Sequence, residues 1–478
     1  MDHAPYRFRM RWWMWLILVA LLLASAALTL RVHGQVRFDA VQADLRARGF
    51  LVDRRDMLAD APAVDADRQR RLEDLFRRMG KWGDNPGSLP GRALGERRYT
   101  QQELDKRADF LRLGRTDATA VAALLAEGPT LMSYYGSMER DADRLDSLSL
   151  NEIWGNSPTS SLLWARAVTN WWALTAVTAE DPRPALAELD RLRVANSQPA
   201  TMIDAMISLA IHAIHDQTCL YLATRGRLPE DALARWLSQQ RDYLPWVATA
   251  FQNERCLSFS RIARIHIGEL SALGVTASGS PSAPWWSGIQ DIPYWVICGH
   301  YGAVGVAEMA NAEAQMRGLP PVEIPRMPFG IPALLSSFAI PNLLESAITA
   351  MESSYVTRLR QTMAVIACRY RAGTPLPIDQ TALAVWLPPG WLDGRDANNP
   401  PIAYERLSAS RVRVGLDPAQ PRPAMIPASR WGSLPGARTY GSTVGSPASA
   451  KIEEDTRWSL EIDLDAILVP PPEKPPRK

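Results

Sequence analysis

Three side chains that can bind transition metals lie close together in the middle of this chain. His212, His215 and Cys219 follow one another at steps of three and four residues, which places them on one face of a helix. Imidazole nitrogens and thiolate sulfurs are ligands for zinc or copper. The spacing matches no established zinc motif, and a layered helical fold often buries both faces of a helix. We therefore weigh a metal site, with zinc as the metal, against ordinary hydrogen-bonded residues of a helical domain.

Further polar groups could complete such a site. Asp216 adjoins the second histidine, and His266 and Glu269 could approach from a helix expected at 245–272. With these groups, the His212/His215 face would serve a metal-dependent enzyme.

Carboxylates offer a second route to catalysis. Four glutamates in otherwise apolar helical segments could pair as general acid and base: Glu254, Glu269, Glu308 and Glu345. Arg255, Arg261 and Arg264 lie near the first two in sequence and favour internal ion pairs instead. The chain has no G-x-S-x-G elbow and no phosphate-binding lysine motif. No reaction follows from these residues, and an enzyme is the less favoured interpretation.

Aromatic residues suggest a different kind of site. Trp285, Trp286 and Trp295 fall in a Ser/Gly/Pro-rich stretch expected to form a loop at 274–299. Loops run over protein surfaces and often carry function, and aromatic rings can stack on sugars or pack in a core. The stretch is therefore a candidate glycan-binding surface, with core packing as the alternative.

The elements that position these residues begin with a membrane anchor. Trp12 to Leu30 contains nineteen residues without a charge, close to the roughly 20 needed to cross a bilayer. Residues 1–11 carry three arginines, so the positive-inside bias predicts a cytoplasmic N-terminus and a periplasmic bulk. The sequence thus predicts a single-pass inner-membrane protein. A cleaved signal peptide, with Ala24–Ala26 at the cleavage site, is the alternative.

Composition limits the partners and the cysteine chemistry. Residues 1–37 hold five arginines and one aspartate and so carry a net charge of +4. The whole chain carries +2, so residues 38–478 carry −2. A near-neutral ectodomain lacks the basic footprint that nucleic acid binding requires. Four cysteines are too few for a disulfide scaffold. In an oxidising periplasm Cys219 and Cys256 could pair, with buried thiols as the alternative.

Hydrophobic periodicity predicts a mainly helical fold. We expect membrane-proximal helices in 38–79, including Phe38–Arg48 and Asp65–Met79, and a helical domain at 101–372. Its helices are expected at 101–112, 116–127, 159–179, 182–195, 200–225, 229–241, 245–272, 300–317 and 341–371. Short connections imply stacked antiparallel hairpins in an irregular, repeat-like array. A small α+β module is expected at 373–464, with strands at 400–404, 410–415 and 457–464. A disordered proline-rich tail is expected at 465–478.

Several stretches resemble one family of uncharacterised, single-pass, membrane-anchored, all-helical bacterial proteins. Leu45–Asp53 is similar to their opening helix, which ends in glycine, and Ala185–Ser208 to a helical hairpin. Pro341–Pro375, ending in Arg369-Tyr370-Arg371-Ala372-Gly373-Thr374-Pro375, looks like their last long helix and its exit. In that family the exit leads into a module resembling the C-terminal half of type II secretion pseudopilins, and Asn399–Tyr404 occupies the matching place. The resemblance implies fold and location. The likeness of the C-terminal module to a pseudopilin tail makes an envelope or secretion assembly a candidate partner. The resemblance supplies no catalytic residues.

Overall fold

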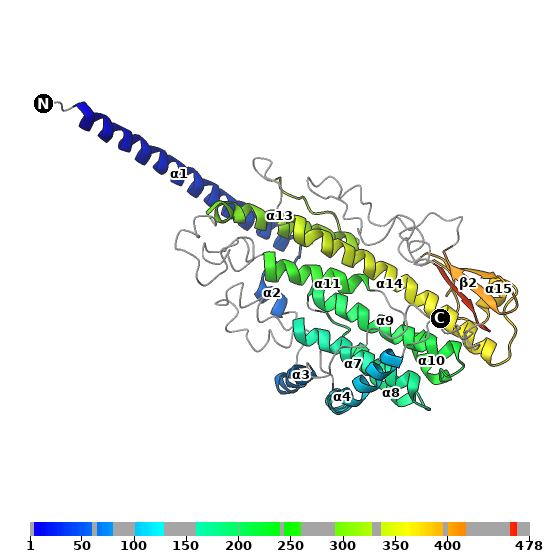
Figure 1. Cartoon of the computed structure of the whole chain (residues 1–478). Helices are drawn as coiled ribbons and strands as arrows, with labels where there is room; N and C mark the ends of the chain where they lie inside the picture. The colour runs from blue at the N-terminus through cyan, green and yellow to red at the C-terminus, as the bar shows by residue number, and fades with distance from the viewer. Residues whose placement is uncertain are drawn as a thin grey trace, which may run out of the picture. The chain divides into compact units, whose positions relative to one another are not determined.

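The computed structural model describes ten stretches of the chain, which are mainly helical and include a small antiparallel sheet (Figure 1). They are residues 4–59, 65–79, 101–128, 159–199, 201–239, 243–259, 292–326, 336–394, 400–416 and 459–465. The chain divides into two compact units. Unit 1 comprises residues 1–61, 141–157 and 251–340, and unit 2 comprises 62–140, 158–250 and 341–478. The sequence-based boundaries at 101–372 and 373–464 stay predictions.

Unit 1 is organised around one long helix, α1 (Ala4–Ala47). It is long and apolar enough to cross a membrane by length and composition. Trp12 and the apolar residues after it are mostly exposed, whereas Gly34, Phe38, Gln42 and Leu45 form a buried stripe at spacings of four, four and three. The predicted separate helix beginning at Phe38 is wrong, because no residue between 31 and 37 breaks the helix.

The end of α1 follows the prediction at Gly49. This residue has a φ of +84°, a conformation that glycine adopts without steric cost. The amide of Phe50 donates to the carbonyl of Leu45 at 2.9 Å, which closes the helix end. The chain then turns into the short helix α2 (Arg54–Ala59), which the sequence analysis did not identify.

The partner of α1 is α13 (Ile292–Met316), and the two helices lie side by side (Figure 1). A Cβ atom on Gly299 would lie 2.6 Å from the carbonyl carbon of Gly34, so the two backbones touch there. Further along, Arg48 of α1 donates to the carbonyl of Pro320, just after α13, at 2.9 Å. Residue numbers therefore increase in the same direction along α1 and α13, so the two helices are parallel.

A buried arginine ties unit 1 together. Arg255 opens a π-helical turn, η1 (Arg255–Phe259), at the end of α11 (Leu244–Glu254). Its guanidinium donates to the carbonyl of Leu51 at 2.6 and 2.9 Å and to the carboxylate of Glu313 at 2.5 Å. The side chain of Arg255 is fully buried, so this group joins the end of α1 to the end of α13.

Unit 2 contains most of the described helices. They are α3 (Ala66–Met79), α4 (Gln101–Ala126), α7 (Thr159–Thr178), α8 (Arg183–Ala195), α9 (Met202–Thr224), α10 (Glu230–Ser238) and α14 (Ser336–Arg371). The helix α7 packs against α4, α8 and α9. The helices predicted at 101–112 and 116–127 are one helix, because Gly114 continues α4 instead of ending it.

A three-stranded antiparallel sheet closes unit 2 near the positions that the sequence predicts, and its first strand begins at Ala403, three residues later than expected. Strands β1 (Ala403–Arg406), β2 (Arg411–Gly415) and β3 (Ser459–Asp463) lie in the order β1-β2-β3. One face buries Val412 and Ile462, which are register partners. The other face carries Arg413, which pairs with Glu461 and Glu405 at 2.7 and 3.1 Å. The short helix α15 (Gln380–Ala384) precedes the sheet.

Candidate functional site: a buried network around His215

The candidate metal ligands all lie on α9, as predicted. Thr201 caps this helix through a capping box with Asp204, which satisfies backbone groups at its first turn. His212, His215 and Cys219 are all buried, with at most 2 % of each residue exposed. The helix therefore presents its polar residues to the inside of unit 2.

His215 is held between two carboxylates. Its Nδ1 lies 3.3 Å from Asp216, and its Nε2 lies 3.3 Å from Asp190 of α8. The sulfur of Cys219 is 3.8 Å from the same Nε2. Burial alone would lower the pKa of His215, but the interaction with Cys219 and the hydrogen bonds with Asp190 and Asp216 raise it well above its ordinary value. The two flanking carboxylates therefore favour the protonated form of the imidazole.

The pKa of the Asp190 carboxylate is shifted in the opposite direction to that of His215. Burial by itself would raise the pKa of Asp190, but its hydrogen bond and charge interaction with His215, together with Arg193, hold it well below its usual range. Arg193 and Arg235 approach the carboxylate of Asp190 at 3.3 and 3.9 Å. Asp190 thus stays ionised and pairs with three cationic side chains.

Asp216 is the most enclosed member of this network, which we call the His215 network: His215, Asp190, Asp216, Cys219, Trp236 and Thr357. The carboxylate of Asp216 accepts a hydrogen bond from Nε1 of Trp236 at 2.9 Å and another from Thr357 at 2.7 Å. Gln361 then donates to the carbonyl of Trp236 at 2.6 Å. The network therefore connects α8, α9, α10 and α14.

His212 lies against aromatic side chains. Its Nδ1 lies 3.2 Å from the hydroxyl of Tyr243, and its ring meets those of Tyr243 and Trp246 edge to face at 5.4 and 4.8 Å. Within the described residues, no group of three or more His, Cys, Asp or Glu side chains could hold a metal ion. The structure thus brings His215 and Cys219 together and gives His212 aromatic neighbours. His266 and Glu269 lie outside the described residues.

The thiol, imidazole and carboxylate of Cys219, His215 and Asp216 follow the order of a nucleophilic triad. Two features oppose that chemistry. Asp190 occupies the Nε2 side of the ring, where the thiol would have to be deprotonated. Every member of the triad is also buried, so a substrate would have no approach through the described surface. The arrangement serves as an internal ion-pair network.

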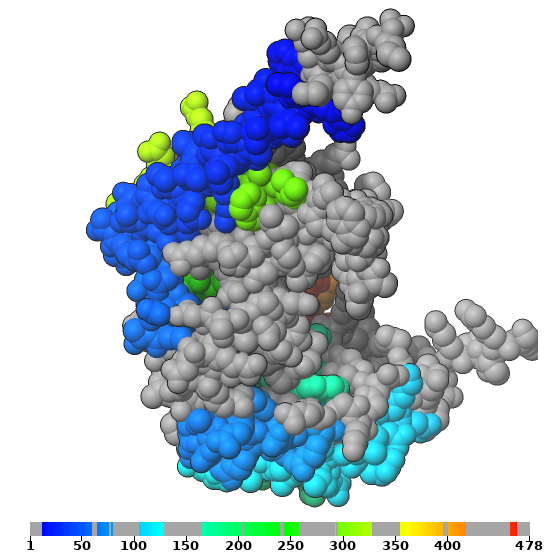
Figure 2. Space-filling model, turned by 90° about the vertical axis from the view of Figure 1, so that its left-hand side faces the viewer, coloured from blue at the N-terminus to red at the C-terminus, as the bar shows by residue number. Residues whose placement is uncertain are grey.

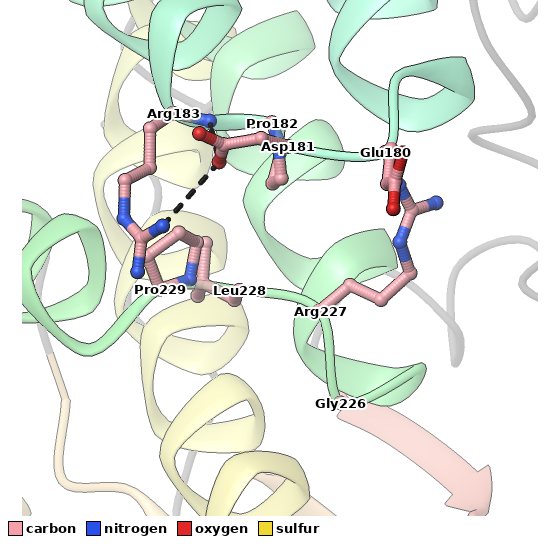
Figure 3. Close-up of a pocket in the computed structure, with 8 residues that line it drawn as sticks. All are labelled: Glu180, Asp181, Pro182, Arg183, Gly226, Arg227, Leu228 and Pro229. Atoms are coloured by element: carbon pink, nitrogen blue, oxygen red, sulfur yellow. Dashed lines mark hydrogen bonds and ion pairs between the residues drawn. The ribbon is translucent and has the colours of Figure 1, made fainter.

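Unit 2 also contains a surface hollow, and none of the residues that line it belongs to the His215 network. The hollow measures about 490 Å³ and is formed by residues 180–183 and 226–229. In Figure 3, Arg183 faces Asp181 on one side, and Arg227 lies beside Glu180 on the other. Arg227 donates to the carbonyls of Val177 and Ala179, and so closes the end of α7. Arg227 therefore stabilises the local backbone at this hollow.

Two other sequence-predicted sites can be located in part. Trp285 and Trp286 lie outside the described residues. Trp295 lies on α13 and not in a loop, because the helix begins at Ile292. Its ring is half-buried and stacks with the guanidinium of Arg31 at 5.2 Å. This part of the predicted glycan surface is therefore a helix contact.

The structure also places some of the glutamates and cysteines that the sequence singled out. Arg255 pairs with Glu313, which the sequence analysis did not single out. Glu308 is buried in α13 without a hydrogen bond to either oxygen from the described residues, and burial raises its pKa to about 7. Glu345 lies where side chains are not described. Cys219 and Cys256 are both thiols, so the disulfide is not formed.

Asp190 is the residue that sequence reasoning missed. It lies 25 positions before His215 on a different helix, and only the packing of α8 on α9 joins them. An acidic residue on a short amphipathic helix gives no signal of this role.

No family model matches the chain, and neither the curated proteins nor the solved structures contain a match to it.

Proposed function

We propose that this protein is a single-pass inner-membrane protein with a structural or protein-interaction role in the cell envelope. The N-terminus lies in the cytoplasm, and residues 32–478 lie in the periplasm. The observation that carries the proposal is the continuity of α1, which runs without a break from an exposed apolar segment to a buried contact with α13. The proposed anchor is therefore continuous with the folded part of unit 1.

The closed interior supports a non-catalytic role. An active site needs a cleft with convergent polar groups, whereas the chemically reactive residues of the His215 network are satisfied by one another and are buried. The helical part of unit 2 would form the stacked hairpins expected from the sequence, which offer extended surfaces to a protein partner. Neither the metal-dependent enzyme nor the glycan-binding module draws support from the described geometry.

The anchor is tested by topology. The full-length chain should remain in the membrane pellet after a carbonate wash, and protease added to spheroplasts should digest it from the periplasmic side. The mass of its N-terminus should match an uncleaved chain. Release into the wash, or a mass that begins after Ala26, would contradict the anchor and favour the signal-peptide alternative.

The structural role is tested by crosslinking in intact cells. Val36 lies on α1 and is exposed, so Val36→Pro breaks the helix while Val36→Ala preserves it. Wild type and Val36→Ala should give the same discrete high-mass adducts, and Val36→Pro should lose them. A chain that stays monomeric in all three strains would remove the interaction role.

A further inference from the structure

The far boundary of the proposed membrane span lies close to Arg31. The nineteen uncharged residues from Trp12 to Leu30 rise about 28 Å along a helix at roughly 1.5 Å per residue, which nearly equals the hydrocarbon thickness of a bilayer. Leu28 and Val32 are exposed on either side of this boundary. Arg31 is therefore the first charged residue on the periplasmic side.

The second helix of unit 1 meets α1 at this level. Arg31 stacks on the ring of Trp295 at 5.2 Å and donates to the sulfur of Cys298. Figure 2 shows the bright green start of α13 directly beside the blue α1. Because the two helices are parallel, the N-terminus of α13 points back toward the bilayer.

The residues at that end suit a membrane interface. Ile292 precedes Trp295 by three positions, so it lies about 4.5 Å nearer the bilayer centre. Its side chain is 40 % exposed. Tryptophan is enriched where hydrocarbon meets headgroups, and an apolar residue one turn deeper would face the acyl chains.

We propose that the first turn of α13, Ile292–Trp295, inserts into the periplasmic headgroup region of the same bilayer that α1 spans. The occupant of this surface is phospholipid. The inference rests on the proposed anchor and adds a second point of membrane contact. This second contact begins at Ile292, 280 positions after Trp12, where the first contact begins. The two contacts together fix the orientation of unit 1 relative to the membrane.

The test measures depth at single cysteines in the full-length chain. Ile292→Cys, Leu22→Cys and Leu319→Cys are each labelled with a fluorescent thiol probe in vesicles of phosphatidylethanolamine and phosphatidylglycerol. All three native side chains are exposed, so the substitutions leave the core intact. Labelled wild-type protein gives the background from its native thiols. Quenching is compared between aqueous iodide and lipids that carry a nitroxide near the headgroup or deep in the acyl chain.

The expected pattern distinguishes the two proposals. The probe at residue 22 should respond to the deep nitroxide, and the probe at 319 to iodide alone. The probe at 292 should respond to the shallow nitroxide, with iodide quenching about threefold or more below that at 319, as an interfacial depth implies. If 292 behaves like 319 while 22 stays within the bilayer, the second contact is refuted and the anchor stands. If 22 is also open to iodide, the anchor fails and the inference fails with it.

Discussion

Removal of the Asp216 carboxylate should strongly destabilise unit 2. This group is fully buried, lies 3.3 Å from the imidazolium of His215 and accepts hydrogen bonds from Trp236 and Thr357 at 2.9 and 2.7 Å. Asp216→Ala removes one of the two carboxylates that balance the buried cation. It also leaves two buried donors without their acceptor.

The cost can be estimated from these contacts. Loss of one partner of a buried ion pair costs about 3–5 kcal/mol, and we take the lower value because Asp190 still faces His215. Each orphaned donor adds roughly 1 kcal/mol at the low end of its range. Contacts in one network are not additive, so we expect a total of about 4 kcal/mol. Thr357→Val removes a single hydrogen bond to the same carboxylate and should cost about 2 kcal/mol.

Native-state hydrogen exchange on the full-length chain in detergent measures this cost where it acts. Peptides from α9 and from residues 354–371 of α14 report the opening free energy of the network. Both substitutions should lower it, with Asp216→Ala about twice as effective as Thr357→Val. A change below about 1 kcal/mol for Asp216→Ala, or equal costs for the two variants, would refute the inference that a buried charge balance stabilises this unit.

Three further predictions use other residues of the fold. The pKa of Glu308 rises from 4.5 to about 7 in the folded chain. The free energy of unfolding should therefore be unaffected by this group below pH 4.5 and fall by about 3 kcal/mol as the pH rises to 7. Glu308→Gln should flatten that pH dependence, measured by amide exchange of α13. Arg255→Met leaves Glu313 buried with its Arg317 contact alone and should cost about 3 kcal/mol in α13 exchange, a loss that Glu313→Gln in the same chain should partly restore. Cys219 should resist alkylation until urea unfolds unit 2; rapid labelling in the native protein would reveal an open path to the His215 network.

The sequence predicted the local elements well where the signal was local. Gly49 ends α1 because only a residue that tolerates positive φ closes the helix there. The strands β1, β2 and β3 were found because alternating apolar residues and nearby turns specify them. The helix α9 was found from its length and periodicity, whereas the burial of His212 and His215 was left open by the sequence.

The errors arose where tertiary packing overrides local preference. A break between helices was predicted at residues 113–115, yet Gly114 is buried within α4, because packing outweighs the cost of about 1 kcal/mol for a glycine inside a helix. Trp295 was assigned to a loop because the composition around it is rich in glycine and proline, but contact with α1 extends α13 back to Ile292. Asp190 was missed because its role depends on a neighbouring helix. Ion-pair partners are chosen by three-dimensional packing, which single-sequence patterns do not contain.

The unbroken length of α1 has a mechanical consequence. Its 44 residues extend about 66 Å as a single rod, and the backbone contact of Gly34 with Gly299 leaves no room for α13 to slide sideways. If this helix spans a bilayer as proposed, a tilt that matches it to the bilayer thickness would also turn the part of unit 1 that packs on it.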